Sequence, residues 1–180
     1  MINAQKPDLI LIGGDLIDNS VVPLYEEKMM EELAELKAPL GIYMVPGNHE
    51  YISGIRKSMQ FINETPIRLL RDNVVTLPGG IQIIGRDDRS NKSRLSLQEL
   101  VKNIDPAKPV ILLDHQPYNL SDTENAGIDL SSADIRIVDR YGRSVSLPTI
   151  CSIKVMVTVS GETATYTFPP DYRFGDHLSG

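Results

Sequence analysis

The stretch Asp8-Leu9-Ile10-Leu11-Ile12-Gly13-Gly14-Asp15-Leu16-Ile17-Asp18 contains an apolar run that ends in two glycines and a carboxylate. A short run of Leu and Ile bounded by glycine is typical of a strand that is buried on both faces of a parallel sheet. Asp15 then lies just beyond the carboxyl end of the strand, where open α/β sheets bind their ligands. This stretch predicts an α/β fold with a candidate functional residue at one edge of its sheet.

Two later segments repeat this pattern. An apolar run at 39–45 leads into Asn48 and His49, and a second run at 110–113 leads into His115. Because parallel strands place their carboxyl ends at the same edge of a sheet, we expect these polar side chains to lie close to Asp15. Each has a simpler explanation when taken alone: Asp15 could cap a turn, Asn48 could adopt a left-handed turn conformation and His115 could be a core histidine. The repetition of the pattern favours a shared site.

The motif Gly14-Asp15-x-x-Asp18, followed by Gly47-Asn48-His49-Glu50 and by the block at 113–117, resembles the calcineurin-like metallophosphoesterases. Within them it is similar to a bacterial group of predicted phosphohydrolases. The resemblance covers most of residues 1–129. It implies a layered αββα sandwich that hydrolyses phosphomonoesters or phosphodiesters at a dinuclear metal centre.

The resemblance also implies roles for individual residues. Asp15 would bridge two divalent ions, and Asn48 and His115 would bind one of them; His49 would donate a proton to the leaving oxygen or steady the phosphate. A carboxylate, an amide oxygen and an imidazole suit Mn, Fe or Zn better than Ca. Two such ions would acidify a bridging water and neutralise the phosphoryl oxygens.

The match to the family is incomplete at both ends. The family's Asp-x-His block on an earlier strand has no counterpart here, which indicates that Met1 is an internal start. The family's closing Gly-His-x-His block is also missing. We therefore expect a sandwich whose first strand and last sheet are missing or replaced, with three of four ligands for one ion and only Asp15 for the other. Such a chain would bind at most one ion, weakly, and would be inactive.

The residues after Asp129 depart abruptly from the family pattern. If the codons for residues 132–140 are read one frame over, they can encode the missing Ser-Gly-His-Thr-His-x-Gly-Gln. We infer that one nucleotide was lost near Leu130, so that 1–129 is a partial metallophosphoesterase domain and 130–180 an out-of-frame, non-native tail that packs poorly. The alternative is a genuine divergent ending, which the hairpin-like alternation of 153–159 and 163–168 would suit.

Composition limits the partners. The chain has 180 residues, a formal net charge of −6 and a single cysteine. This charge argues against a nucleic-acid-binding surface, and one cysteine excludes an internal disulfide. No run approaches the roughly 18 apolar residues of a membrane span, and no signal peptide is evident. The expected substrate is a phosphorylated small molecule or a lipid-linked phosphoester. The sequence does not determine where the protein is localised. One possibility is that a segment preceding these residues in the parent protein holds it at a membrane.

The remaining elements follow from periodicity. We predict helices at 23–37, 54–64, 96–103 and 119–125, and short strands at 67–70, 74–77 and 81–85. Asp87 and Asp88 follow the last of these strands. They could form a further metal site, but charged residues in an exposed loop are usually solvated, and we interpret them in that way.

Two other functions compete with the hydrolase. One is a scaffold that keeps the fold but binds a partner without turnover, which would suit a divergent tail. The other is a flavodoxin-like binding module, which would need a phosphate-cradling loop where Gly14 and Asp15 place a carboxylate.

Overall fold

A computed structural model describes residues 2–116, 126–128, 130–131, 156–160 and 163–167. The first sheet has the order β1-β2-β3 and is parallel throughout. It consists of β1 (Ile10–Ile12), β2 (Ile42–Met44) and β3 (Arg68–Leu69). The first two strands lie within the predicted apolar runs, and every residue in them is buried.

The second sheet has the order β4-β5-β6-β7. Its strands are β4 (Asn73–Thr76), β5 (Gln82–Gly85), β6 (Val110–Leu113) and β7 (Leu130–Ser131). The first pair is antiparallel, and β5, β6 and β7 are parallel. A separate antiparallel pair joins β8 (Met156–Ser160) to β9 (Thr163–Thr167).

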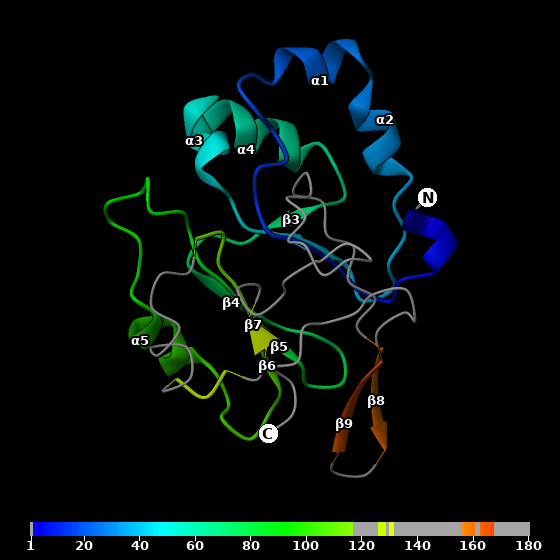
Figure 1. Ribbon diagram of the computed structural model, residues 1–180, viewed down its shortest axis with the longest axis vertical. Helices are drawn as coiled ribbons and strands as arrows, with labels where there is room; N and C mark the ends of the chain where they lie inside the picture. The colour runs from blue at the N-terminus through cyan, green and yellow to red at the C-terminus, as the bar shows by residue number, and fades with distance from the viewer. Residues whose placement is uncertain (1, 117–125, 129, 132–155, 161–162, 168–180) are drawn as a thin grey trace, which may run out of the picture.

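The helices are short. A 3-10 turn, η1 (Ile2–Gln5), precedes β1. Helices α1 (Val22–Glu26), α2 (Met29–Ala34), α3 (Asn48–Ile52) and α4 (Ile55–Asn63) belong to the first half of the chain. Helix α5 (Leu97–Leu100) continues into the 3-10 turn η2 (Val101–Asn103). In Figure 1, α1 to α4 lie at the top of the molecule, and α5 lies lower down, to the left of the second sheet.

Alternating side chains build the layers, because successive residues of a strand point to opposite faces of a sheet. Leu9, Leu11 and Tyr43 from the first sheet pack against Ile83 and Ile111 from the second. The opposite face of the first sheet packs against the helices of the first half of the chain, through Ile10, Ile12, Met44, Leu33, Phe61 and Ile62. The opposite face of the second sheet packs against α5, through Ile84, Val110, Leu112, Leu97 and Leu100.

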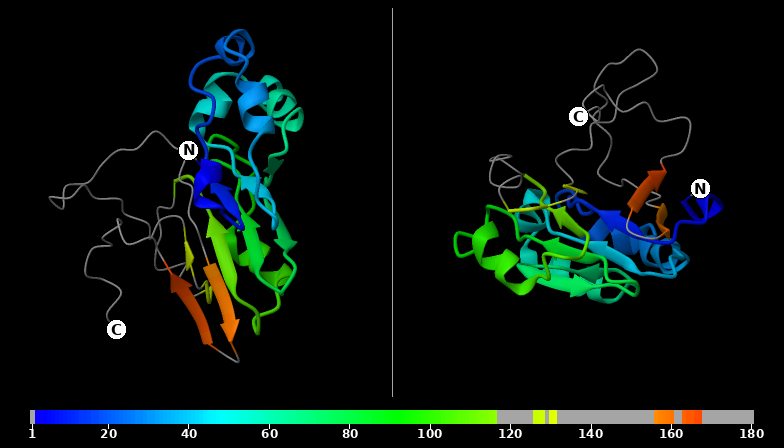
Figure 2. Two further views of the ribbon diagram at one scale, coloured as in Figure 1. Left: turned by 90° about the vertical axis from the view of Figure 1, so that its right-hand side faces the viewer. Right: turned by 90° about the horizontal axis from the view of Figure 1, so that it is seen from below.

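The order of layers is therefore helices, sheet, sheet, helix, which confirms the predicted α/β sandwich and is consistent with an incomplete one. Figure 2 shows the strands of the two sheets running beside each other in both views. The carboxyl ends of β1, β2, β5 and β6 are the ends that lead toward Asp15, Asn48, Asp87 and His115.

The prediction of one continuous helix at 23–37 is wrong, because the structure has two shorter helices there. Lys28 has a φ of 57°, in the left-handed region, and separates α1 from α2. The first helix ends before Lys28, whose backbone amide donates to the Tyr25 carbonyl three residues back, whereas Glu27 still makes the helical bond to the Pro23 carbonyl. The ring of Tyr25 packs edge-on against Phe61 of α4, with ring centres 5.2 Å apart. The left-handed backbone of Lys28 therefore changes the direction of the chain within the predicted helix.

The predicted helix at 119–125 lies outside the described residues, as does most of the predicted tail. The described part of the tail includes the β8–β9 pair, whose strands overlap the two segments that alternate in the sequence. The prediction that the tail packs poorly concerns side chains that the structure does not describe.

Candidate metal centre

Three predicted ligands from three different loops meet at one point. The Nε2 atom of His115 lies 3.1 Å from Oδ2 of Asp15 and 3.2 Å from Oδ1 of Asn48. Asp15 follows β1, Asn48 begins α3 after β2, and His115 follows β6. The site therefore draws on both sheets, and the side chains of Asp15 and His115 are mostly buried.

A further hydrogen bond orients each of these three side chains. The Nδ1 atom of His115 lies 2.7 Å from the carbonyl oxygen of Gly13, which can only accept a hydrogen bond. Nδ1 must therefore carry a proton, which in a neutral imidazole leaves Nε2 as a lone-pair acceptor. The side-chain amide of Gln116 donates to Oδ1 of Asn48 at 2.9 Å, which assigns that atom as the amide oxygen. The backbone amide of His49 donates to the other oxygen of Asp15, Oδ1, at 3.0 Å.

Three acceptor atoms thus face one another. A carboxylate oxygen, an amide oxygen and an imidazole nitrogen repel each other unless positive charge lies between them. A proton on Nε2 would supply that charge, and so would a divalent cation. The residues therefore fit a bound metal ion, and this set of donors suits Mn, Fe or Zn. In the described part of the chain, no group of three or more His, Cys, Asp or Glu side chains forms a metal cluster, so the third donor here is the Asn48 amide.

Glycine makes the close approach of the loops feasible. Gly14 has a φ of 101°, and a Cβ atom built on it would lie 2.7 Å from both the Gly47 nitrogen and the His115 Nδ1. A Cβ atom on Gly47 would collide with Oδ1 of Asp15. Asp15 itself has a φ of 55°, which is uncommon for a residue with a side chain. The two loops thus touch through backbone atoms.

Glu50 locks these two loops together. Its side chain is fully buried, and its carboxylate accepts hydrogen bonds from three backbone amides. Oε2 accepts from Asp15 at 2.9 Å and from Gly47 at 2.6 Å, and Oε1 accepts from Ile17 at 2.9 Å. Burial raises the pKa of Glu50, and the hydrogen bonds from Ile17, Gly47 and Asp15 offset part of that rise. The carboxylate therefore replaces water as the partner of amides that would otherwise be buried alone.

His49 lies beside the centre and is half-buried. Its Nδ1 atom lies 2.7 Å from Oδ1 of Asp18 and 3.1 Å from the Asp18 carbonyl oxygen. Desolvation lowers the pKa of His49, but the hydrogen bonds to Asp18 and the charges of Asp15 and Asp18 outweigh it, so the net shift is upward. The imidazole therefore carries a proton more readily than an isolated histidine does.

The sequence interpretation of Asp87 and Asp88 as solvated loop charges is wrong. Each residue is only 1% exposed. Asp87 forms an ion pair with Arg71 at 2.7 Å, and Asp88 accepts a hydrogen bond from the Ser90 amide at 2.8 Å. The charge of Asp87 is tolerated in the interior because it is paired with Arg71 and accepts a further hydrogen bond from Asn91.

The sequence reasoning missed several residues of the site. The role of Glu50 had a local signal, because a Glu three residues after a helix-starting position commonly bonds back to the amide there. The bond from Gln116 to Asn48 and the bonds among Tyr51, Arg71 and Asp87 had none, since their partners are 12 or more residues away or belong to another loop.

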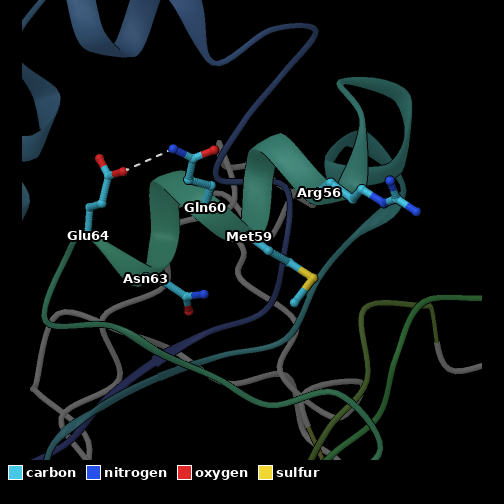
Figure 3. A pocket seen from close by; sticks show the side chains of 5 residues that line it. All are labelled: Arg56, Met59, Gln60, Asn63 and Glu64. Carbon is cyan, nitrogen blue, oxygen red and sulfur yellow. Dashed lines mark hydrogen bonds between the residues drawn. The ribbon is translucent and has the colours of Figure 1, made fainter.

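A shallow pocket also lies along α4, away from this centre (Figure 3). None of the candidate site residues lines it. Its lining residues are Arg56, Met59, Gln60, Asn63 and Glu64.

Comparisons with known proteins give a family for this chain. The family model for calcineurin-like phosphoesterases matches residues 1–147. An uncharacterized metallophosphoesterase of Aquifex aeolicus is 38% identical over 119 residues, which are 63% of this chain and 44% of the relative. An uncharacterized metallophosphoesterase of Helicobacter pylori is 36% identical over 134 residues, which are 72% of this chain and 35% of the relative.

A more distant relative is a transmembrane protein with a metallophosphoesterase domain from Bos taurus, 30% identical over 65% of this chain and 30% of its own length. The matches thus cover less than half the length of these curated relatives. No solved structure matches the chain significantly. Among the described residues, no helix has the length and apolar character needed to cross a membrane.

The analysis of Glu50 leads to a stability prediction. We expect Glu50→Gln to lower the free energy of unfolding by about 1–3 kcal/mol, because a Gln side chain places an N–H group against backbone amides that need an acceptor. Denaturant titration followed by circular dichroism measures this change.

Glu31→Gln is the matched control. Glu31 is largely exposed and pairs only weakly with Lys28 at 3.8 Å, so its substitution should change the free energy of unfolding by less than about 0.5 kcal/mol. Equal stability of the two variants would contradict the role assigned to Glu50.

Proposed function

Because the chain belongs to the calcineurin-like phosphoesterase family, we propose that its parent protein hydrolyses phosphoester bonds in a metal-dependent reaction at the centre formed by Asp15, Asn48 and His115. The observation that carries this proposal is the convergence of three acceptor atoms, His115 Nε2, Asp15 Oδ2 and Asn48 Oδ1. Family membership supports phosphoester chemistry on a phosphorylated substrate. The assignment of individual residues and of the metal content is our own.

Asp15 Oδ2, Asn48 Oδ1 and His115 Nε2 would hold the ion. A bound divalent cation supplies positive charge to the phosphoryl oxygens and lowers the pKa of a water molecule beside them. In the parent protein we propose two such ions, with Asp15 shared between them. Since the present chain offers three ligands for one ion and only Asp15 for the other, we propose that it binds at most one ion, weakly, and lacks activity.

The remaining groups orient Asp15 and His115 and set the role of each ring nitrogen in the two histidines. The Gly13 carbonyl holds His115 Nδ1 protonated, which keeps Nε2 directed toward Asp15 and Asn48. The His49 amide fixes Oδ1 of Asp15, which leaves Oδ2 for the ion. Asp18 engages Nδ1 of His49, so Nε2 is the ring nitrogen from which a proton would pass to the leaving oxygen. The raised pKa of His49 favours the protonated form that this role requires.

The net charge of −6 favours a substrate other than a nucleic acid, because binding to a polyphosphate backbone is driven by excess positive charge. We propose a phosphorylated small molecule or a lipid-linked phosphoester instead. The name of the Bos taurus relative supports a parent protein associated with a membrane.

Metal binding by the chain itself is the first test. We expect titration calorimetry with Mn²⁺ to show about one site per chain, and His115→Ala to weaken it by at least about tenfold, because the substitution removes one of the three donors. Asp8→Asn, at an exposed carboxylate outside the site, is the control and should bind as the wild type does. Unchanged affinity in His115→Ala would refute the proposed centre.

The role of His49 is tested in the longer parent protein. We expect His49→Ala to reduce kcat on a chromogenic phosphodiester or phosphomonoester by about 10²–10⁴-fold, because general acid catalysis typically contributes that much. Metal content, measured by atomic emission, should stay the same. Full activity in this variant would remove His49 from the mechanism. A parent protein that binds metal but shows no turnover on either substrate would favour the scaffold function.

A further inference from the structure

The candidate centre depends on how the edges of two sheets are placed against each other. Asp15 and Asn48 follow strands of the first sheet, whereas His115 follows β6 of the second. The layer between the sheets is apolar, and apolar contacts do not fix direction. Directional contacts at the edge are therefore needed to bring Asn48 to His115 with the accuracy that a metal site requires.

A polar network beside the centre provides such contacts. Arg71 follows β3 of the first sheet, and Asp87 follows β5 of the second. Arg71 donates to Oδ2 of Asp87 from Nε at 3.0 Å and from Nη2 at 2.7 Å. Tyr51 of α3 donates from its hydroxyl to Oδ1 of Asp87 at 2.7 Å and accepts from Arg71 Nη2 at 2.9 Å. This network thus joins α3 and both sheets.

Several further hydrogen bonds hold Asp87 in place at the end of β5. Its Oδ2 also accepts from the Asn91 side chain at 2.9 Å, and its Oδ1 accepts from the Asp88 amide at 2.9 Å. Its backbone amide donates to Oδ1 of Asp72 at 3.0 Å, and Arg94 donates to its carbonyl oxygen at 3.0 Å. Asp87 therefore has a fixed position at the end of β5, and Tyr51 and Arg71 both bond to it.

The protonation states support this arrangement. Burial on its own would raise the pKa of Asp87, but hydrogen bonds from Arg71, Tyr51 and Asn91 outweigh it and lower the pKa. Burial and the hydrogen bond to Asp87 raise the pKa of Tyr51 to about 12. The carboxylate is thus ionised and the phenol protonated at neutral pH, which is the combination that the network needs.

We propose that Tyr51, Arg71 and Asp87 are positioning residues, which hold α3 so that Asn48 meets His115. Asn48 and Tyr51 are three residues apart in the same helix and so lie on neighbouring positions of one helical face. Fixing the Tyr51 hydroxyl on Asp87 therefore fixes the rotation of α3 and with it the direction of the Asn48 side chain. This inference rests on the proposed function, because it assigns these residues a role at the metal centre.

The test compares two tyrosine variants. Tyr51→Phe removes one hydroxyl and leaves the ring in place. We expect it to weaken Co²⁺ binding by about tenfold and to change the visible absorption spectrum of the bound Co²⁺, because loss of a group that orients a ligand typically costs 10–100-fold in affinity. Tyr25→Phe is the matched control: it removes a hydroxyl that donates to the exposed Glu64 at 3.1 Å, and it should leave both affinity and spectrum unchanged.

The outcomes separate this inference from the proposed function. If the wild type binds Co²⁺ and Tyr51→Phe binds it equally tightly with the same spectrum, the positioning role is refuted while the centre stands. A loss of thermal stability in Tyr51→Phe with an unchanged spectrum would also refute it, because that result describes a structural role only. A wild type that does not bind Co²⁺ would overturn the metal centre proposed for this chain together with this inference.

Discussion

The carboxylate of Glu50 is the contact on which the candidate centre depends. It binds the amides of Asp15, Ile17 and Gly47, and so joins the loop after β1 to the loop after β2. The first loop carries Asp15, and the second leads directly into Asn48 and His49. Glycines at 14 and 47 allow the backbones to touch, but glycine alone provides no attraction. A buried carboxylate with amide partners on both loops provides that attraction and leaves Asp15 free to direct its own oxygens elsewhere.

The site also depends on a division of roles between apolar and polar contacts. Strands buried on both faces give two stacked sheets, and this packing supplies the stability of the sandwich without specifying the geometry of its edge. Polar groups supply that geometry. The carbonyl of Gly13 orients His115, the amide of His49 orients Asp15, and Asp87 ties α3 to the second sheet. Nearly every residue that could contact an ion or a phosphate is thereby held by a second residue behind it.

The sequence predicted the parts of this structure that are local or periodic. The apolar runs located β1, β2 and β6, and the rule that parallel strands end at one edge predicted that Asp15, Asn48 and His115 lie together. The interior position of Asp87 was not predictable, because a charge run looks the same whether it is solvated or paired with Arg71 from 16 residues away. The break between α1 and α2 was also missed, since the left-handed backbone of Lys28 occurs at a residue type that gives no local turn signal.

The central claim is that Asp15, Asn48 and His115 form a cation site. Anomalous diffraction from crystals of the chain grown with Zn²⁺ would test it most directly. We predict a single strong anomalous peak about 2.0–2.2 Å from Asp15 Oδ2 and from His115 Nε2, with Asn48 Oδ1 turned toward it. A map in which the peak lies elsewhere, or in which His115 keeps its direct contact with Asp15 while Zn²⁺ is in excess, would contradict the claim.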